Sequence, residues 1–295
     1  MRKHLFAILY GLLLTAFTVY VALDAFVLVR VYGNAAGSDA TSSIAVQPTS
    51  VPPTITENSY QDANITLTIT EHREHNTSIF VADVLLTSPM LLKTALAQGA
   101  YGRNVTQKTS AIAQDVGAIL AINGDYYGSR ERGFVVRGGV TYRESSMGYD
   151  ALAIMADGSF CVAEEDDTSV SELVGAGAVH VFSFGPALVQ EGNITVTERD
   201  EVGKAMADNP RTAIGVIEPG HYVLLVSDGR TRQSDGLTLL QLAEFMQSLG
   251  VTTAYNLDGG GSSTMVFMGE VINNPTTNGR KITERSVSDI VYIGY

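Results

Sequence analysis

Residues 256–264, NLDGGGSST, place a carboxylate, three successive glycines and three hydroxyl side chains within one short segment. The preceding residues 251–255 form a short apolar run typical of a buried strand, so we expect Asp258 just past the end of that strand. Glycines can turn consecutive N–H groups into one concavity, which suits an anion. The segment predicts a site for a phosphorylated or sugar-like ligand; a glycine-rich hairpin or surface loop is the alternative.

A second polar cluster, Asn123-Gly124-Asp125, follows the apolar residues 118–122. A short helix is predicted before that strand, at residues 110–116. A clearer helix precedes the strand that leads to Asp258, because Thr238 and Gln241 have capping-box spacing and a glycine follows the apolar face. The order helix, strand, polar loop is therefore predicted twice.

Further short motifs, together with these two clusters, resemble the phosphodiester glycosidase family over roughly residues 111–295. The NLDGGGSS run combined with NPRTA is the specific part of that resemblance. It implies hydrolysis of the bond between the anomeric carbon of a sugar and a phosphodiester oxygen. The further motifs are FGP at 184–186, NPRTA at 209–213, DGR at 228–230, GLT at 236–238 and NP at 274–275.

Two aspartates are the predicted catalytic pair. A glycoside is usually cleaved by two carboxyl groups, one as acid and the other as base or nucleophile. Asp125 and Asp258 each follow a predicted buried strand and fit this need. Burial and neighbouring charges decide which of them is the acid. We expect Asp258 to lie nearest the anomeric carbon, because its own loop supplies the predicted phosphate cradle.

Phosphate binding matters more than acid assistance here, because charge develops on the phosphate as the bond breaks. Arg211 offers a planar fork that matches a phosphate, although a surface salt bridge is its alternative role. The Asp-Gly-Arg motif is a further binding candidate or a plain turn. The predicted substrate-binding residues are Asn123, Arg211, Asn256, Gly259, Gly260, Gly261, Ser262, Ser263, Asp228 and Arg230, with the two asparagines holding sugar hydroxyls or orienting the aspartates.

Other chemistries lack their motifs. The sequence has no Gly-x-Ser-x-Gly elbow, no Gly-Lys-Ser/Thr phosphate loop and no His-Glu-x-x-His. We expect no required cofactor; Ca²⁺ held by Asp and backbone oxygens stays open, without EF-hand spacing. Two other functions also stay open: a non-catalytic glycan- or wall-binding module, and a metal-dependent phosphodiesterase that cuts the P–O bond.

The amino terminus predicts a membrane anchor. Basic residues precede an apolar run at residues 5–23, which nearly spans a hydrocarbon core of about 30 Å. We expect residues 1–32 to form an uncleaved single-pass anchor with the positive end in the cytoplasm, and a cleaved signal is the alternative. Residues 33–60, rich in Ser, Thr and Pro, are the expected flexible linker, and 61–295 the glycosidase-like domain.

The charge balance narrows the possible binding partners, and the cysteine content limits disulfide formation. Three of the 19 Lys and Arg residues and one of the 31 Asp and Glu residues lie in residues 1–30, which leaves 16 basic and 30 acidic residues. This balance argues against nucleic acid as a partner. Cys161 is the single cysteine, so no internal disulfide forms, and an alternating strand pattern predicts it as a small core residue.

The fold class is predicted as α+β, a mixed β-sheet with hairpins and a few packed helices. Hairpins are expected at residues 133–143, 151–163 and 211–227, each with a glycine-containing turn. The expected location is the cell membrane of a bacterium with the domain outside the cytoplasm, and the expected substrate is a sugar phosphodiester or glycan of the cell envelope or exopolysaccharide.

Overall fold

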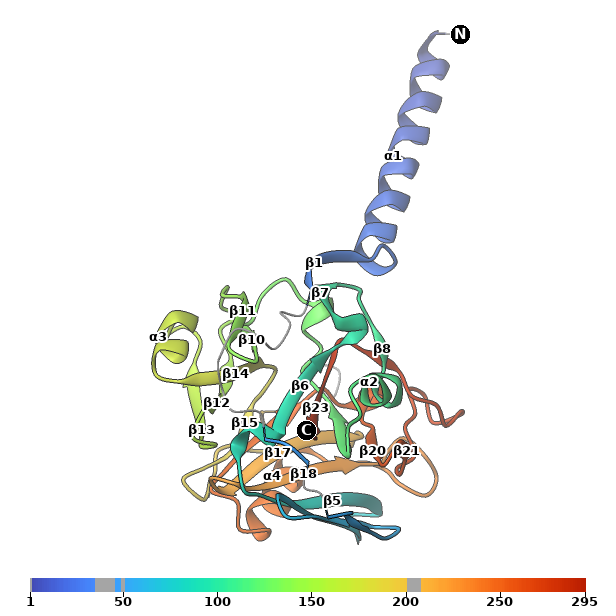
Figure 1. Ribbon diagram of the computed structural model, residues 1–295. Coiled ribbons are helices and arrows are strands. Elements are labelled where there is room, and N and C mark those ends of the chain that lie inside the picture. The colour runs from blue at the N-terminus through green and yellow to red at the C-terminus, as the bar shows by residue number, and fades with distance from the viewer. Residues whose placement is uncertain (1, 35–45, 49–50, 201–207) are drawn as a thin grey trace.

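The structure is a computed structural model that describes residues 2–34, 46–48, 51–200 and 208–295. Residues 35–45 and 49–50 of the predicted linker lie outside the described residues. Three larger antiparallel sheets build the domain, and the first helix projects away from it (Figure 1).

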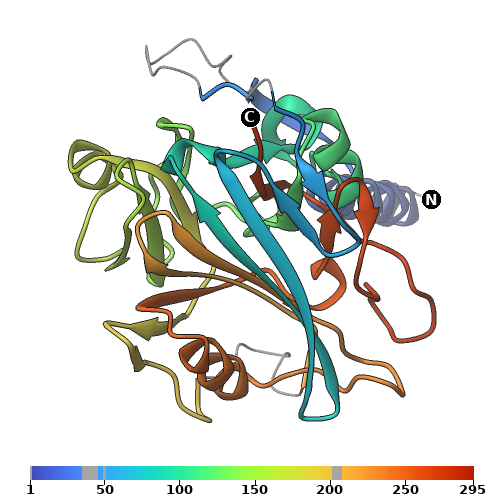
Figure 2. The same ribbon diagram turned by 60° about the horizontal axis from the view of Figure 1, so that its bottom comes forward.

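The largest sheet has nine strands, and the segment that contains Asp258 follows one of its inner strands. Figure 2 shows the twist of this sheet, with the long hairpin of β4 (Ile65–Glu74) and β5 (Thr77–Leu86) in blue and cyan. In order across the sheet the strands are β16 (Asn193–Ile194), β15 (Ala187–Gln190), β19 (Thr253–Leu257), β17 (Arg211–Glu218), β18 (His221–Ser227), β5 (Thr77–Leu86), β4 (Ile65–Glu74), β3 (Ser59–Gln61) and β2 (Thr54–Ile55).

Helix α4 (Leu239–Ser248) packs on one face of this sheet and leads into β19. It begins with the predicted capping box. The N–H of Gln241 donates to Thr238 Oγ1 at 3.1 Å, and the N–H of Thr238 donates to Gln241 Oε1 at 2.9 Å. The helix ends before Gly250, whose φ of +83° glycine adopts without strain. Local sequence therefore fixes both ends of the element that positions the Asp258 strand.

A second sheet carries the other polar strand end. Its strands are, in order, β21 (Glu270–Val271), β20 (Met265–Phe267), β9 (Leu120–Asn123), β23 (Asp289–Ile293) and β6 (Leu92–Leu96). Helix α2 (Thr109–Asp115) packs on β9 and β23. The main core joins this sheet to the nine-stranded one, since Ile122, Leu224 and Val291 are fully buried in one cluster.

The third sheet lies at one side of the domain and carries α3 (Val170–Gly175). Its strands are β11 (Val140–Arg143), β10 (Val135–Arg137), β14 (Ala178–Ser183), β12 (Asp150–Met155) and β13 (Phe160–Glu164). Two short pairs complete the topology: β1 (Arg30–Asn34) with β7 (Ala100–Arg103), and β8 (Gln107–Lys108) with β22 (Ser286–Val287).

The α+β class and the three expected hairpins are confirmed. The structure differs from the predicted mixed sheet in one respect, because every strand pair among the described residues is antiparallel. The nine-stranded sheet also begins at Thr54, ahead of the predicted domain start at residue 61. Strands of two or three residues carry too little alternation to be read from sequence.

The prediction that Cys161 is a core residue is wrong, because the residue is exposed. It lies in β13, an edge strand of the third sheet. Its neighbours Phe160 and Val162 pack against the main core, so Cys161 points the other way. Alternation shows which residues share a face of a strand, and long-range packing decides which face is buried.

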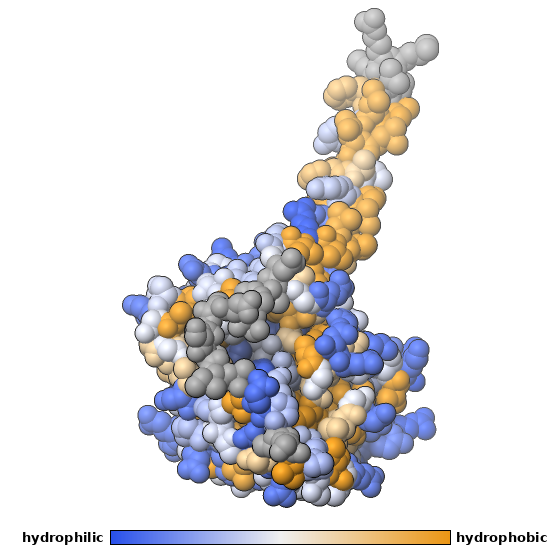
Figure 3. All heavy atoms as spheres, viewed as in Figure 1, coloured by the Kyte–Doolittle hydropathy of each residue, from blue (hydrophilic) through white to orange (hydrophobic). Residues whose placement is uncertain are grey.

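Helix α1 (Arg2–Phe26) contains the predicted apolar run. Its residues Ile8–Phe26 are long and apolar enough to cross a membrane by length and composition, a test that a signal sequence near the amino terminus also passes. Figure 3 shows apolar side chains along most of this helix, which stands clear of the domain. The apolar helix is therefore confirmed, and its insertion in a membrane stays a prediction.

Candidate active site

The two polar strand ends meet, as the repeated sequence pattern predicts. The N–H of Asp258 donates to the carbonyl of Gly124 at 3.1 Å. Asn123 Nδ2 donates to the Asp258 carbonyl at 2.6 Å. Its Oδ1 accepts from Thr212 Oγ1 at 2.9 Å and from the N–H of Thr264 at 3.2 Å. Asn123 therefore holds the backbone of the Asp258 loop in place, and its expected role of orienting an aspartate or a sugar hydroxyl stays a prediction.

The glycine run folds as a tight turn that packs closely on its neighbours. Gly260 has a φ of +61°, and its N–H donates to the Pro210 carbonyl at 2.8 Å. A side-chain carbon added at Gly261 would meet Thr277 Oγ1 at 2.4 Å. The glycines are thus required by backbone geometry and close approach, and the Gly260 N–H, predicted to bind phosphate, is already hydrogen-bonded.

Asp258 is paired with an arginine that the sequence analysis did not single out. Arg285 Nη2 lies 2.8 Å from Asp258 Oδ2, and Arg285 Nε donates to Ser262 Oγ at 2.8 Å. The Arg285 guanidinium also lies 5.2 Å from the centre of the Tyr126 ring. Burial raises the pKa of Asp258, and the charge of Arg285 opposes that rise. The Arg285 side chain is 34% exposed and that of Asp258 10%, so solvent reaches the pair from the arginine side.

Two further arginines lie near this carboxyl group. Arg230 packs over Gly260, and its Nη1 donates to the Thr277 carbonyl at 2.7 Å. Burial lowers the pKa of Arg230, and the nearby charge of Arg285 lowers it further. Arg130 lies 4.7 Å from the centre of the Phe184 ring, and its charge also acts to lower the pKa of Asp258. One carboxyl group with three guanidinium groups near it is an arrangement that suits the binding of an anion.

Three other predicted binding residues make internal contacts. Arg211 is 3% exposed, and its Nε donates to the Leu237 carbonyl at 2.8 Å. Asp228 accepts from the N–H and from Nδ2 of Asn274, both at 2.8 Å, so it holds the chain there. Asn256 Nδ2 donates to the Gly185 carbonyl at 2.8 Å.

Two buried oxygens in the same region have no partner. Asn256 Oδ1 and Ser263 Oγ are buried and accept or donate no hydrogen bond among the described residues. Buried polar atoms are normally paired with protein or with water. These two atoms therefore lie where a water molecule or a ligand hydroxyl is expected beneath the Asp258 loop.

Asp125 lies in a different environment, inside a buried ion cluster. Arg137 Nη2 lies 3.0 Å from Asp125 Oδ2 and 2.7 Å from Asp289 Oδ2. Asp125 also accepts from the N–H groups of Ser183 at 3.1 Å and Tyr127 at 3.2 Å. Protein donors therefore occupy both of its oxygens. The sequence analysis missed Arg137 and Asp289, which lie far apart in the chain.

The pKa of Asp289 reflects this crowding. Burial raises it to about 7, with the charge of Arg137 opposing and that of Asp125 adding to the rise. Its Oδ1 has no hydrogen-bond partner among the described residues. A side-chain carbon at Gly124 would meet this oxygen at 2.2 Å, so Asp289 packs directly against the polar loop after β9.

The described residues contain no group of three or more His, Cys, Asp or Glu side chains placed to hold a metal ion. The acidic residues of the site are instead matched to arginines, as described above. The compatibility of the sequence with Ca²⁺ stays a prediction.

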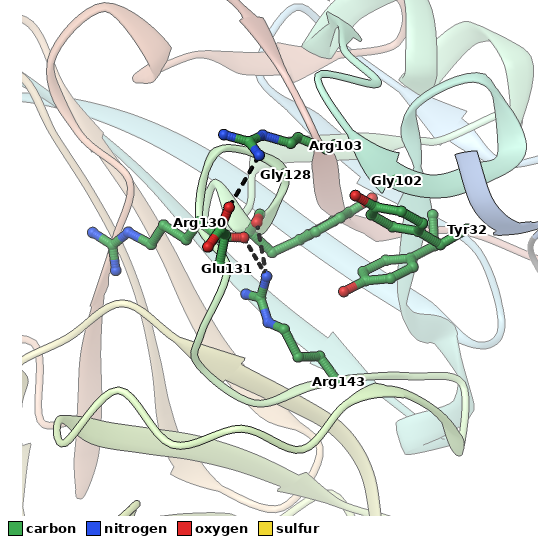
Figure 4. Close-up of a pocket in the computed structure, with 9 residues that line it drawn as sticks. Tyr32, Gly102, Arg103, Gly128, Arg130, Glu131 and Arg143 are labelled. Atoms are coloured by element: carbon green, nitrogen blue, oxygen red, sulfur yellow. Dashed lines mark hydrogen bonds and ion pairs between the residues drawn. The ribbon is translucent and has the colours of Figure 1, made fainter. Parts of the chain in front are cut away.

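A cavity of about 210 Å³ adjoins the site (Figure 4). The 3₁₀ turn η4 (Tyr127–Ser129) separates the two, because Tyr126 precedes it beneath Arg285, and Arg130 follows it. Asp258 is not among the residues that line the cavity. We call it the Arg/Tyr cavity, after its lining residues Tyr32, Tyr101, Gly102, Arg103, Tyr127, Gly128, Arg130, Glu131 and Arg143.

Comparison with known sequences decides the family. Residues 116–294 match the sequence model of the phosphodiester glycosidase family. The chain belongs to the phosphodiester glycosidase family. The matched segment contains Asp125, Asp258 and Arg285, so the whole candidate site lies inside the phosphodiester glycosidase domain.

Two relatives of this domain come from very different organisms, Bacillus subtilis and the mouse. An uncharacterised prophage-derived protein of Bacillus subtilis is 28% identical over 66% of this chain and 31% of its own length. The mouse N-acetylglucosamine-1-phosphodiester alpha-N-acetylglucosaminidase is 28% identical over 66% of this chain and 40% of its own length. The chain therefore spans less than half the length of either relative.

A solved structure shares the fold. The catalytic domain of the zebrafish N-acetylglucosamine-1-phosphodiester alpha-N-acetylglucosaminidase, auto-inhibited by its pro-peptide, superposes with a TM-score of 0.61. The match covers 78% of this chain and 83% of that domain at 22% identity. Because this match covers more of the chain than residues 116–294, it also supports the same fold for residues outside the family match.

Proposed function

We propose that this protein hydrolyses the bond between the anomeric carbon of a sugar and the phosphate oxygen of a phosphodiester. The observation that carries the proposal is the carboxyl group of Asp258 with Arg285, Arg230 and Arg130 around it. Membership of the phosphodiester glycosidase family supports it, and the name of the mouse relative describes this type of linkage.

The chemistry follows from the charges. Cleavage passes through an oxocarbenium-like state, with positive charge on the sugar and negative charge on the departing phosphate. Asp258 faces the anomeric carbon and stabilises the positive charge. Arg285 and Arg230 hold the phosphate, whose oxygen keeps the electrons of the broken C–O bond. A water oxygen bonds to the anomeric carbon and releases one proton to the departing phosphate or to solvent, so the products are the free sugar and a phosphomonoester.

The second predicted aspartate has another role in this proposal. Both oxygens of Asp125 accept hydrogen bonds or an ion pair from protein donors. We assign it to the cluster with Arg137 that fixes the loop after β9, and this loop in turn bonds to Asp258. Asp125 is therefore a positioning residue.

The finer location and substrate also belong to this proposal. The apolar residues Ile8–Phe26 anchor the chain in a bacterial cell membrane, and the domain lies outside the cytoplasm. A domain held there meets sugar phosphodiesters of the cell envelope or of exopolysaccharide.

Hydrolysis in ¹⁸O-labelled water tests the reaction. The full chain in detergent is incubated with N-acetylglucosamine 1-phosphodiesters of several aglycones. The proposal expects the label in the sugar. Label in the phosphate would show P–O cleavage and favour a metal-dependent phosphodiesterase, and binding without turnover would favour a glycan-binding module.

A further inference from the structure

We propose that the Arg/Tyr cavity receives the anionic headgroup of a membrane amphiphile, so that the substrate is a lipid-linked glycosyl phosphodiester. The inference rests on the proposed function and on the anchor α1. It concerns the aglycone, which leaves the site as the phosphomonoester, and it assigns a ligand to a cavity that lies beyond the Asp258 cluster.

The first step is the docking of the chain that follows the anchor. Only residues 27–29 separate α1 from β1, and β1 pairs with β7, with Arg30 opposite Arg103. The amide of Asn104 donates to the Leu28 carbonyl at 3.0 Å. A side-chain carbon at Gly102 would lie 2.1 Å from the Arg30 carbonyl oxygen, so this position admits β1 only as glycine. The domain is therefore held directly at the end of the membrane helix.

The second step is the position of Tyr32. The register of β1 shifts between Val31 and Gly33, so Tyr32 is the extra residue of a β-bulge, a device that re-aims a side chain. Tyr32 lines the cavity beside Tyr101, with ring centres 6.1 Å apart (Figure 4). The six residues after Phe26 span at most about 20 Å when extended. Tyr32 at the cavity mouth therefore lies within about 20 Å of the end of the anchor helix, on the side of the domain that faces the anchor.

The third step concerns the charged residues that line the cavity. The cavity is lined by three arginines and one glutamate in a chain whose formal net charge is −12. Arg103 Nη1 pairs with Glu131 Oε1 at 3.0 Å. Arg143 donates to backbone carbonyls, with Nε 2.6 Å from the Gly133 oxygen, and burial lowers its pKa. Because no carboxylate pairs with Arg143 or Arg130 among the described residues, an anion is the ligand this cavity favours.

The fourth step is the apolar part of the ligand. Phe26 is 82% exposed, Val31 55% and Tyr32 62%, so an apolar surface continues from the helix to the cavity mouth. Tyr101 stacks on Tyr127 with ring centres 5.1 Å apart, which adds aromatic faces inside. Tyrosine rings with exposed apolar side chains are typical of the membrane–water interface. An acyl or prenyl chain in the bilayer would leave the cavity along this surface.

The cavity and the reacting carboxyl group share one residue. Arg130 lines the cavity, and its charge acts on Asp258 from across η4. One phosphate held by Arg285 and Arg230, with Arg130 on its cavity side, would present its sugar to Asp258 and its aglycone to the cavity. A lipid aglycone then meets the membrane from which the anchor emerges.

The test compares two esters in one membrane. The full chain is reconstituted in liposomes with N-acetylglucosamine 1-(hexadecyl phosphate) in the bilayer or with the methyl ester in solution. We expect kcat/KM at least about tenfold higher for the hexadecyl ester, because its apolar chain holds the substrate in the bilayer beside the cavity. Arg103→Gln should lower the ratio of the two values about tenfold. Glu131→Gln, which removes the cavity's carboxylate on an exposed loop, should raise that ratio.

Arg132→Gln is the matched control, because Arg132 is an exposed neighbour that does not line the cavity, and it should leave the ratio unchanged. Equal kcat/KM values for both esters in the wild-type protein, or a ratio unaffected by both cavity variants, would overturn the inference and leave the proposed function standing. Equal values with inhibition by inorganic phosphate that Arg103→Gln relieves would place free phosphate in the cavity, which also overturns it. Hydrolysis of neither ester would overturn the proposed function itself.

Discussion

The loops that carry Asp125 and Asp258 have the same sequence pattern and opposite surroundings. Asp258 pairs with Arg285, whose side chain is 34% exposed. Asp125 pairs with Arg137, whose side chain is 4% exposed and which also binds Asp289. A carboxylate at the end of a strand can thus serve chemistry when its cation faces solvent, and it can hold the fold when that cation is buried.

The largest expected effect on stability comes from the buried cation. Arg137→Leu leaves Asp125 and Asp289 facing each other without a counter-charge, and breaking a buried ion pair costs about 3–5 kcal/mol. Urea denaturation should show this loss of unfolding free energy. The exposed Arg132→Leu is the control, with an expected change within about 0.5 kcal/mol. A wild-type midpoint for Arg137→Leu would show that the cluster does not support the fold.

The half-buried Arg285 should affect catalysis instead. Arg285→Lys keeps the charge and loses the fork that spans Asp258 and Ser262. We expect kcat/KM for a sugar phosphodiester to fall on the order of tenfold to hundredfold with little change in stability. Arg280→Lys, at an exposed residue five positions earlier in the same segment, should be neutral. An equal loss in both variants would remove Arg285 from the site.

A smaller effect, on the pH dependence of the unfolding free energy, is expected at Asp289 in the buried cluster. The folded-state pKa of Asp289, about 7, lies above its ordinary value of 3.8, so the folded protein holds this proton more tightly than the unfolded chain. The stability from this group is complete below pH 3.8 and is lost as pH rises through 7. The side chain of the Asp289→Asn variant cannot ionise. As pH rises from 5 to 8, the unfolding free energy of the wild type should therefore fall relative to that of the variant. A difference independent of pH would contradict the raised pKa.

The elements of this fold were predictable where short-range signals specify them. The capping box of α4 and the glycine turns of the hairpins act within a few residues. Each polar cluster was predicted to follow a strand, and the structure shows that the ends of β9 and β19 meet. Both predicted aspartates were therefore found at the positions where their strands end.

The partners of the aspartates were not predictable in the same way. Arg285 lies 27 residues beyond Asp258, and Asp289 lies 152 residues beyond Arg137. Only the packing of separate strands brings these charges together, and nothing in the local sequence marks them. Arg211 was favoured for its place in a motif, yet it is 3% exposed and bonds to Leu237. Motif position predicted where the polar loops lie, and long-range packing determined which side chains surround them.

The most direct test compares Asp258→Asn with Asp125→Asn in the full chain, measuring kcat on an N-acetylglucosamine 1-phosphodiester and the midpoint of thermal unfolding for each. Asp258→Asn should lower kcat by about a thousandfold or more and leave the midpoint close to wild type, because it removes a reacting charge from a partly open pair. Asp125→Asn should lower the midpoint and reduce kcat of the folded protein less than about tenfold, because its charge stabilises a buried cluster. Near-wild-type kcat for Asp258→Asn, or a thousandfold loss for Asp125→Asn at an unchanged midpoint, would contradict the assignment of the two carboxylates.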